Sequence, residues 1–236
     1  MLEGDPRATL EALEPPSAPP AWLAGWRDAD ARAAEAIDRL ATGEPAVARA
    51  LVRDLPAGAV LVVGSSMPVR DVETFAPARD DGGPRVLANR GANGIDGTIA
   101  TALGVAASGA PTAVLLGDVA LVHDLGALAA AARDAPSLAI VCVDNAGGGI
   151  FDFLPVSGVE AAVYERHVAT PPGLDLPAVA RALGLAVHED PPDVPLAVER
   201  AWRDGGPALI HVRTERAANV ALHRRIWHEV AAALDR

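Results

Sequence analysis

The sequence contains no lysine, so all 20 of its basic residues are arginine. Acidic residues number 31, which gives a formal net charge of −11. Surfaces that bind nucleic acids are rich in positive charge, and we therefore expect no nucleic-acid partner. Arginines placed singly in an acidic protein suit the paired hydrogen bonding of carboxylates, although ordinary surface ion pairs account for many of them.

The single cysteine and the lack of long apolar runs exclude further classes. Cys142 lies inside an apolar run, and one thiol forms neither a disulfide framework nor a cysteine-based zinc site. We interpret it as a small buried hydrophobic residue. No apolar run reaches the roughly 18 residues of a membrane span, so no span is expected. The acidic, proline-rich start, MLEGDPRATLEALEPP, resembles neither a signal peptide nor a basic transit peptide, which favours a cytoplasmic protein.

The chain length of 236 residues suits one large domain, or one domain and part of another. Residues 1–20 contain five prolines and little periodicity, which is typical of a linker or of the end of a preceding domain. Residues 21–54 have the apolar spacing of a helix that breaks at a glycine and a proline and is followed by a second short helix. We divide the chain into residues 1–42, a linker and domain remnant, and a main domain at 43–236.

From residue 58 onward, short apolar strands alternate with helical patterns. The expected strands are 59–64, 85–89, 112–118, 137–145, 185–189 and 207–213. The expected helices are 66–76, 94–108, 122–133, 175–183, 194–204 and 216–234. Continuous apolar strands separated by helices predict an α/β fold, a doubly wound parallel sheet with helices on both faces.

Polar clusters follow four of these strands. Ligands of such sheets bind beyond the carboxyl ends of the strands, so the clusters should converge on one edge. Their sequences are GSSMPVRD, NRGANGIDG, GDVALVHD and DNAGGGIFDF. Four clusters at one edge indicate a ligand site better than any one of them does.

Two of these clusters supply oxygen ligands. Asp118 ends one apolar strand, and Asn145 holds the corresponding position after the next strand. Together with a backbone carbonyl from the following glycines, they form an all-oxygen half-shell that suits Mg²⁺, which prefers few protein ligands plus phosphate and water. The alternative is that Asp118 only caps the helix that follows it.

Three consecutive glycines, Gly147 to Gly149, come directly after this position. Because glycine has no Cβ, a carbonyl there can coordinate a metal and the N–H groups can hold a diphosphate. The alternative is a flexible loop. However, the next residues, IFDFLP, are large and apolar, which is typical of a pocket wall.

Several familiar motifs are missing. Neither VGSSMPVRD nor LANRGANGIDG contains G-x-G-x-x-G, so a dinucleotide fingerprint is absent. Ser65 and Ser66 lack the G-x-S-x-G context of a hydrolase. His123-Asp124 is assigned to a helix start, because adjacent residues on a helix do not face each other. The histidines without metal-binding spacing, interpreted as surface or packing residues, are His167, His188, His211, His223 and His228.

Two arginines, Arg70 and Arg90, each lie just past a strand within these clusters. Structural ion pairs are one explanation for them. Beside an edge that suits phosphate and metal, they indicate an anionic substrate instead.

The ordered motifs resemble those of a known family. GDVA followed by VDN resembles the thiamine-diphosphate signature, in which Gly-Asp-Gly is followed by a paired Asn. VGSSMPVRD, NRGANGIDG, GDVALVHDLGAL and DNAGGGIFDFLP resemble the C-terminal domain of the 2-succinyl-5-enolpyruvyl-6-hydroxy-3-cyclohexene-1-carboxylate (SEPHCHC) synthases of menaquinone biosynthesis, over about residues 40–236. That family condenses isochorismate with 2-oxoglutarate, after decarboxylation on thiamine diphosphate. The resemblance implies that 43–236 is the diphosphate-binding domain and 1–42 the end of a central domain.

The resemblance also implies roles for individual residues. Cofactor-binding residues would be Asn93, Gly94, Ile95, Gly117, Asp118, Val119, Ala120, Asn145, Gly147, Gly148 and Ile150. Mg²⁺, with Mn²⁺ as an alternative, would be held by the side chains of Asp118 and Asn145 and the carbonyl of Gly147. Substrate residues would be Ser66, Arg70, Arg90, Ile150, Phe151 and Leu154. Among these, Ile95 would be the apolar wedge that keeps the cofactor bent between its two rings.

Three positions depart from the family pattern. Val119 replaces the last glycine of the general signature, and Asp144 replaces the first asparagine of the pair. Ala120 stands where the nearest relatives often carry serine, which removes one hydrogen bond to the diphosphate.

In this family an N-terminal pyrimidine-binding domain supplies a glutamate that protonates the aminopyrimidine ring. The sequence begins after such a domain, so we expect no catalytic residue within it and no turnover by this chain alone. Either the sequence is a fragment or a separate polypeptide supplies the other half. The cofactor of the family lies between subunits, which implies a homo-oligomer.

Two other functions stay open. One is a non-catalytic module that keeps the fold, and the other is a different thiamine-diphosphate enzyme, such as a 2-oxoacid decarboxylase or an acetolactate-type synthase. Arg70 together with NRGANGIDG argues against the latter, because those enzymes need no second clamp for a dicarboxylate.

Overall fold

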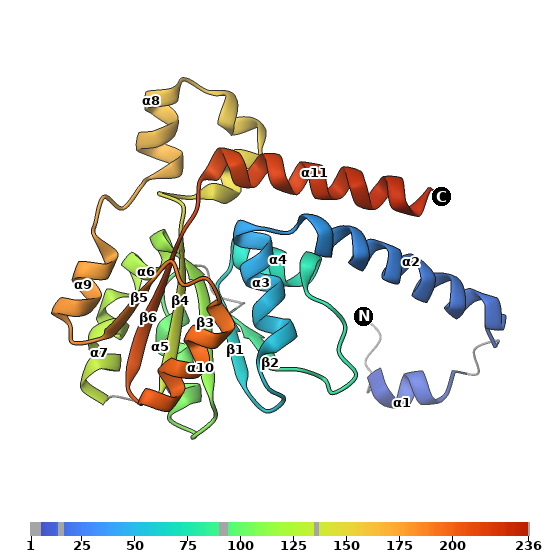
Figure 1. Ribbon diagram of the computed structural model, residues 1–236, viewed down its shortest axis with the longest axis horizontal. Coiled ribbons are helices and arrows are strands. Elements are labelled where there is room, and N and C mark those ends of the chain that lie inside the picture. The colour runs from blue at the N-terminus through green and yellow to red at the C-terminus, as the bar shows by residue number, and fades with distance from the viewer. Residues whose placement is uncertain (1–5, 14–16, 90–93, 135–136, 236) are drawn as a thin grey trace.

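The computed structural model describes residues 6–13, 17–89, 94–134 and 137–235. Within these residues the chain forms one six-stranded parallel sheet in the order β2-β1-β3-β4-β6-β5 (Figure 1). Its strands are β1 (Val60–Val63), β2 (Arg85–Ala88), β3 (Thr112–Gly117), β4 (Leu138–Asp144), β5 (Ala186–Glu189) and β6 (Pro207–Arg213). Each lies where the sequence predicts a strand, because runs of aliphatic and β-branched residues suit a sheet covered on both faces.

Helices connect the strands and extend the chain beyond the sheet. They are α1 (Pro6–Glu11), α2 (Pro20–Leu40), α3 (Gly43–Asp54), α4 (Met67–Phe75), α5 (Thr98–Ala106), α6 (Asp118–His123), α7 (Leu125–Asp134), α8 (Ala161–Tyr164), α9 (Leu176–Ala182), α10 (Val194–Asp204) and α11 (Arg216–Leu234). Between β4 and α9 lie two 3₁₀ turns, η1 (Gly149–Phe153) and η2 (Pro155–Gly158), and a π-helical turn, η3 (Glu165–Ala169).

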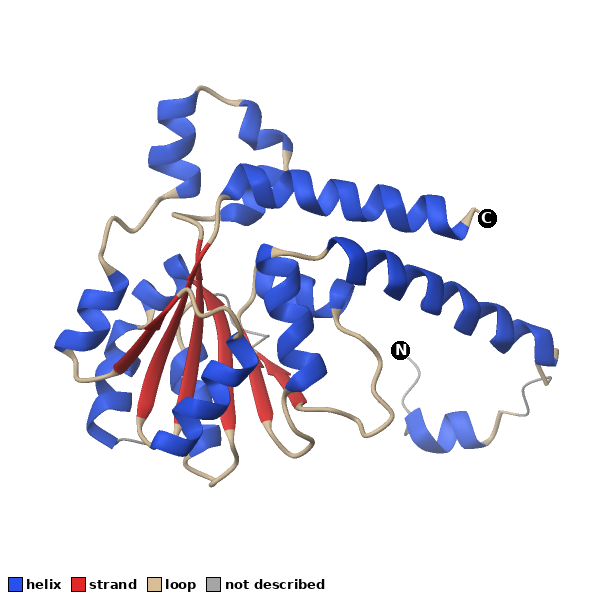
Figure 2. Cartoon of the chain, in the orientation of Figure 1, coloured by secondary structure: helices blue, strands red, loops and turns tan. Residues whose placement is uncertain are grey.

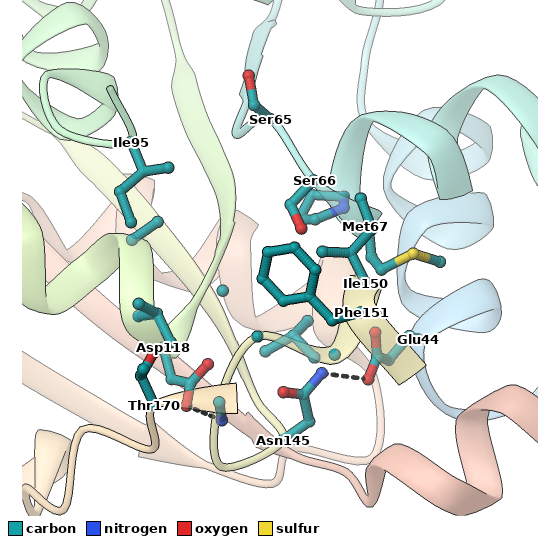
Figure 3. Close-up of a pocket in the computed structure, with 18 of the residues that line it drawn as sticks. Glu44, Ser65, Ser66, Met67, Ile95, Asp118, Asn145, Ile150, Phe151 and Thr170 are labelled. Carbon is teal, nitrogen blue, oxygen red and sulfur yellow. Dashed lines mark hydrogen bonds between the residues drawn. The ribbon is translucent and has the colours of Figure 1, made fainter. Parts of the chain in front are cut away.

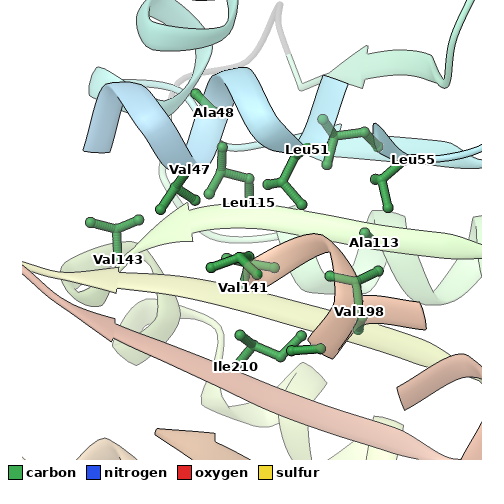
Figure 4. Close-up of a cluster of buried hydrophobic side chains, with 14 of the residues drawn as sticks. Val47, Ala48, Leu51, Leu55, Ala113, Leu115, Val141, Val143, Val198 and Ile210 are labelled. Carbon is green, nitrogen blue, oxygen red and sulfur yellow. The ribbon is translucent and has the colours of Figure 1, made fainter. Parts of the chain in front are cut away.

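Helices cover both faces of the sheet, so the predicted doubly wound fold is confirmed (Figure 2). Helices α3, α4 and α10 pack on one face, where Leu51 of α3 meets Leu115 and Val141 of the central strands (Figure 4). Helices α5, α6, α7 and α9 pack on the other face, against the alternate strand residues such as Leu116 and Cys142. The two faces arise because successive side chains of a strand point to opposite sides. The lone thiol is buried among aliphatic residues, as predicted.

The helix predicted at 122–133 is two helices, α6 and α7, which meet at Asp124. The side chain of Asp124 turns to the start of α5, where Oδ2 accepts hydrogen bonds from the N–H groups of Ile99 (2.6 Å) and Ala100 (3.4 Å). The side chain of Asp124 therefore serves the start of the neighbouring helix α5, while its backbone carbonyl accepts hydrogen bonds at the start of α7, the helix that follows it. The carboxylate satisfies donors that have no partner within their own helix.

Helices α2 and α11 lie side by side and antiparallel, and they extend away from the sheet (Figure 1). Near the sheet, Ile37 of α2 and Ile226 of α11 pack around Phe75. Farther out, Arg32 donates a hydrogen bond to the carbonyl oxygen of Ala233 at 3.3 Å. Of the two, α2 leads into α3, which begins three residues after α2 ends.

Within residues 1–20, α1 forms a short helix. An exposed ion pair between Arg7 and Glu11, one helical turn apart, supports this helix. No helix in the described part of the chain is both long and apolar enough to cross a membrane.

Candidate metal and ligand site

The carboxyl ends of β1, β3 and β4 lie side by side and open into a cavity of about 460 Å³ (Figure 3). The segments after these strands supply most of its lining, so the predicted convergence on one edge is observed for them. The predicted site residues that line the cavity are Ser66, Arg70, Ile95, Gly117, Asp118, Val119, Ala120, Asn145, Gly147, Gly148, Ile150 and Phe151.

Four predicted residues stand apart from this set. Arg90 and Asn93 lie outside the described residues. Gly94 and Leu154 do not belong to the lining of this cavity. Leu154 follows η1 in an extended conformation and is 47% exposed, because the 3₁₀ turn carries it out to the surface. The structure therefore does not place it in the cavity wall that IFDFLP predicts.

Asp118 is the first residue of α6 and follows β3 directly. It is only 1% exposed, and its Oδ2 accepts a hydrogen bond from the N–H of Gly147 at 2.7 Å. Burial raises the pKa of Asp118 to about 6, and the negative charge of Asp144 adds to the increase. Among the described residues no basic side chain offsets this charge. A buried carboxylate of this kind favours a cation beside it.

Asn145 follows β4 and presents the two ends of its amide to different surroundings. Nδ2 donates a hydrogen bond to Oε1 of Glu44 at 2.9 Å. Oδ1 is buried and accepts no hydrogen bond from the described residues, and it points toward the side of the cavity where Asp118 lies (Figure 3). Buried oxygens without a donor are rare and need an explanation, and a bound cation is one.

The donor set at this edge is mixed. Among the described residues, no group of three or more His, Cys, Asp or Glu side chains could hold a metal ion. What the cavity offers is a carboxylate from Asp118, the amide oxygen of Asn145 and the backbone of the glycine run. Hard cations such as Mg²⁺ take oxygen ligands of these three kinds, with water and phosphate completing the shell.

The glycine run is needed for close packing as well as for access to a ligand. Gly147 has a φ of +135°, and a Cβ there would lie 2.6 Å from the carbonyl oxygen of Ala169. A Cβ on Gly149 would lie 2.8 Å from Nδ2 of Asn145. The first glycine thus lets the loop pack closely against the end of η3, and the second leaves room for the amide to turn toward Glu44. The sequence-based explanation, approach to a ligand, covers only part of this requirement.

The segment after β1 contributes a strained residue and an arginine. Ser66 precedes α4 with a φ of +83°, a conformation that costs free energy for any residue with a side chain. Arg70, one turn later, donates a hydrogen bond from Nη1 to the Ser66 carbonyl at 2.7 Å. A guanidinium has five N–H donors, so this bond leaves most of them for an anionic group in the cavity.

The opposite part of the cavity is apolar. Ile95 and Phe151 are each 38% exposed, and Ile150 and Met67 lie beside Phe151 (Figure 3). Large apolar side chains left open to solvent inside a cavity indicate a surface for a partly apolar ligand. The cavity thus joins an oxygen-rich floor to a hydrophobic wall.

Two residues at the site were not predicted from the sequence. Glu44, the second residue of α3, lines the cavity and is 5% exposed. Burial raises its pKa, although hydrogen bonds from Asn145 and Thr214 oppose the increase. The Thr214 hydroxyl donates to Oε1 of Glu44 at 2.8 Å. Nothing local in the sequence marks these residues, since an acid in the first turn of a helix is ordinary.

His211 of β6 is buried beside the site, not merely packed. Its Nε2 donates a hydrogen bond to Oδ2 of Asp144 at 2.9 Å. This bond lowers the pKa of Asp144, although burial opposes the effect. His211 is thus a buried packing residue, one of the two alternatives that the sequence left open, and it also supports the ionised form of a second carboxylate next to Asp118.

Comparison with known proteins gives one family and several relatives. The family model "Thiamine pyrophosphate enzyme, C-terminal TPP binding domain" matches residues 74–212. The chain is 44% identical over 248 residues to a SEPHCHC synthase of Myxococcus xanthus, a match that covers 99% of this chain and 41% of the relative. It is 44% identical over 225 residues to the enzyme of that name from Rubrobacter xylanophilus, with 91% and 38% covered. The chain therefore spans about two fifths of the length of these curated relatives.

A solved structure shows the same fold. The benzoylformate decarboxylase from Polynucleobacter necessarius superimposes with a TM-score of 0.56 at 22% identity, over 73% of this chain and 33% of that chain. At this level of identity the likeness concerns the fold alone, and it agrees with the doubly wound sheet predicted from the sequence.

Proposed function

Because the chain belongs to the thiamine pyrophosphate enzymes, as their C-terminal TPP binding domain, we propose that it is the diphosphate- and metal-binding part of a SEPHCHC synthase. Such an enzyme decarboxylates 2-oxoglutarate and adds the remaining four-carbon unit to isochorismate, in menaquinone biosynthesis. The identities of 44% to two relatives of that name support this choice of reaction.

The observation that carries the proposal is the pair of oxygens at the ends of β3 and β4. Asp118 is a buried carboxylate whose pKa is raised to about 6 by burial. Asn145 turns a buried amide oxygen, which has no donor among the described residues, toward the same space. Both fit a divalent cation, with the carbonyl of Gly147 as the third ligand from this chain. We infer Mg²⁺, for which Mn²⁺ can substitute because both take oxygen ligands.

The same edge suits a diphosphate. Gly117, Val119 and Ala120 line the cavity next to Asp118, and Gly148 lines it beyond the metal ligands. Backbone N–H groups approach an anion closely where side chains are small. Ile95 and Ile150 would contact the organic part of the cofactor, as would Asn93 and Gly94. When bound, thiamine diphosphate supplies the carbanion chemistry that loss of CO₂ from a 2-oxo acid requires.

The residues of this chain then have two tasks toward the substrates. Arg70 and Ser66 would bind carboxylate oxygens, since both substrates carry them, and Arg90 would do the same. Phe151 and Ile150 would exclude water from the apolar side of the cavity. Charge-assisted hydrogen bonds are strongest in such a partly dehydrated space.

We further infer that this chain acts with a pyrimidine-binding domain that supplies the activating glutamate, in a homo-oligomer. The chain spans about two fifths of its relatives, which supports a partner region elsewhere. Within the chain, residues 43–236 would form the cofactor-binding domain and 1–42 the end of a central domain. The cytoplasmic location stays a prediction.

Calorimetric titration tests the proposal directly. The chain would be titrated with thiamine diphosphate and Mg²⁺, alone and with a polypeptide comprising the N-terminal part of the Myxococcus xanthus relative. We expect Mg²⁺-dependent binding that tightens when the second polypeptide is present. Absence of binding in both arms would contradict the cofactor site.

The reaction is tested on the reconstituted pair. We expect a condensation product from 2-oxoglutarate and isochorismate. Cofactor binding without that product would favour a non-catalytic module, and release of CO₂ from 2-oxoglutarate with no transfer to isochorismate would favour a decarboxylase.

A further inference from the structure

Glu44 reaches the site from a part of the chain far from the strand ends. It belongs to the first turn of α3, on the face of the sheet that α3 covers, and its carboxylate points to the Asn145 amide across the floor of the cavity (Figure 3). An acid at the start of a helix usually lies in solvent, where it interacts with the helix dipole. Glu44 is instead only 5% exposed, so its burial needs another reason.

Two donors converge on a single oxygen of this carboxylate. Nδ2 of Asn145 lies 2.9 Å from Oε1, and the hydroxyl of Thr214 lies 2.8 Å from the same atom. Thr214 follows β6 directly, and its own N–H donates to the carbonyl of Asp144 at 2.9 Å. The hydroxyl therefore holds Oε1 in place from a rigid strand end, and the carboxylate in turn faces the amide.

This arrangement decides which end of the amide enters the cavity. An ionised carboxylate accepts hydrogen bonds and donates none, so Nδ2 is the end of Asn145 that can face it. If the amide turned over, its oxygen would lie about 3 Å from a carboxylate oxygen, and the two would repel each other. Its NH₂ group would then point into the cavity, where it could bind no cation.

We propose that Glu44 is a positioning residue that holds the Asn145 amide with Oδ1 turned into the cavity, and that it thereby sets the affinity of the site for a divalent cation. The inference rests on the proposed function, because it takes Oδ1 of Asn145 as a metal ligand. Partners that orient metal ligands without touching the metal change metal affinity by about 10- to 100-fold when they are removed.

The role of Glu44 differs from a general attraction of cations by negative charge. A charge acts at a distance, so its effect on the affinity for a cation would persist after loss of the Asn145 side chain. A positioning residue acts through the amide alone, so its effect should vanish when the amide is absent. Replacement of Glu44 by glutamine further separates the positioning role from the charge effect, because Gln Oε1 still accepts both hydrogen bonds while the charge is lost.

The test measures the affinity of the full chain for Mn²⁺, with thiamine diphosphate in excess. Water proton relaxation enhancement suits this measurement because it responds to Mn²⁺ held on the protein. We expect Glu44→Ala to weaken Mn²⁺ binding about tenfold or more. Glu44→Gln should stay within about threefold of the unchanged chain, since it keeps the acceptor. Thr214→Val, the matched control that leaves the Asn145–Glu44 hydrogen bond in place, should change the affinity less than Glu44→Ala does.

A double-mutant cycle completes the design. In an Asn145→Ala background, Glu44→Ala should cause no further loss. Thermal unfolding without metal shows whether the alanine variant folds. If it does not, Glu44→Leu replaces it in the same comparison, because leucine keeps the side-chain volume. Two results would overturn the proposal in favour of a simple charge effect. One is that Glu44→Gln weakens Mn²⁺ binding as much as Glu44→Ala does. The other is that Glu44→Ala weakens Mn²⁺ binding in the Asn145→Ala background as much as it does in the unchanged chain.

The experiment also distinguishes this inference from the function on which it rests. If the unchanged chain holds no Mn²⁺, the proposed metal site is contradicted and the role of Glu44 with it. If the unchanged chain holds Mn²⁺ and Glu44→Ala or Glu44→Leu holds it equally well, only the role of Glu44 is contradicted.

Discussion

The backbone N–H of Gly147 donates a hydrogen bond to Oδ2 of Asp118 at 2.7 Å. The two residues follow neighbouring strands, so this bond joins the end of β3 to the loop after β4. It holds a buried carboxylate and the glycine loop in one arrangement before any ligand arrives. Preorganised sites of this kind bind with a smaller cost in conformational freedom.

Replacing Asp118 by asparagine should make the metal-free chain more stable. The raised pKa of about 6 means that the folded chain holds this proton more tightly than the unfolded chain, whose carboxyl has an ordinary value of 3.8. Stability therefore falls as the pH rises from about 4 to about 6, and it stays lower above that range. We expect Asp118→Asn to raise the free energy of unfolding by about 2 kcal/mol at pH 7.5, measured by urea denaturation with a chelator present.

The same variant should lose Mg²⁺-dependent binding of thiamine diphosphate in the titration described above. A gain in stability together with a loss of binding is the expected signature of a carboxylate kept for function. A variant that binds normally, or one that is less stable than the unchanged chain, would contradict this interpretation of Asp118.

Replacing Gly147 by alanine should destabilise the chain. The new Cβ would lie 2.6 Å from the carbonyl oxygen of Ala169, and the φ of +135° is unfavourable for alanine. We expect a loss of about 2 kcal/mol in the free energy of unfolding, together with weaker cofactor binding. Gly158→Ala is the matched control, because its Cβ would meet no atom within 4 Å. Equal stability of the two variants would show that the loop relaxes around the added methyl group.

The buried pair of His223 and Asp71 should make stability depend on pH. Nε2 of His223 lies 2.8 Å from Oδ1 of Asp71, and Nδ1 donates to the carbonyl of Asn219. Burial opposes the charged form of His223, but the hydrogen bond and charge of Asp71 outweigh it, and the pKa is raised above 6.5. This contribution to stability is complete below about pH 6.5 and is lost as the pH rises through the raised pKa.

Urea denaturation at a series of pH values from about 6 to about 9 measures this decline. His223→Gln should flatten the decline, because glutamine does not titrate. His228→Gln, on the exposed side of the same helix, should leave it unchanged. If the decline persists in His223→Gln, another group causes it.

Removing the carboxylate of Asp124 should destabilise the start of α5. Its Oδ2 accepts hydrogen bonds from the N–H groups of Ile99 and Ala100, and the side chain is buried. We expect Asp124→Ala to lower the free energy of unfolding by about 1 to 2 kcal/mol, measured by chemical denaturation. Asp134→Ala, at the exposed end of α7, should change it by less than about 0.5 kcal/mol. Similar changes in the free energy of unfolding for the two variants would mean that water replaces the Asp124 carboxylate at the start of α5 without cost.

The sheet and its ligand-binding edge were predictable because their signals are local. Each strand is a short apolar run, and parallel strands bring their carboxyl ends to one edge whatever the order of the strands. Asp118 and Asn145 could therefore be placed together although neither is near the other in sequence. The glycine run marked the same edge, since consecutive glycines in a structured segment indicate close packing of backbone.

Other parts of the site depend on contacts that no local pattern encodes. Glu44 and Asn145 are 101 residues apart, and Glu44 and Thr214 are 170 apart. Which helix lies over which strand follows from the whole topology, so a single sequence gives no reason to pair them. The break at Asp124 was missed for a similar reason, because its partners belong to a different helix. The antiparallel packing of α2 on α11 likewise joins two distant ends of the chain.

The hydrogen bonds of Glu44 with Asn145 and Thr214 make completion of the proposed metal site a late step of folding. They join α3, the loop after β4 and the end of β6, and contacts over such separations form slowly because long loops must close first. A nascent chain that lacks β6 already contains Asp118 and Asn145, the proposed metal ligands, but not the Thr214 hydroxyl that bonds Glu44. Under the proposed function, metal and cofactor would stabilise the finished fold by mass action more than they would stabilise an incomplete chain.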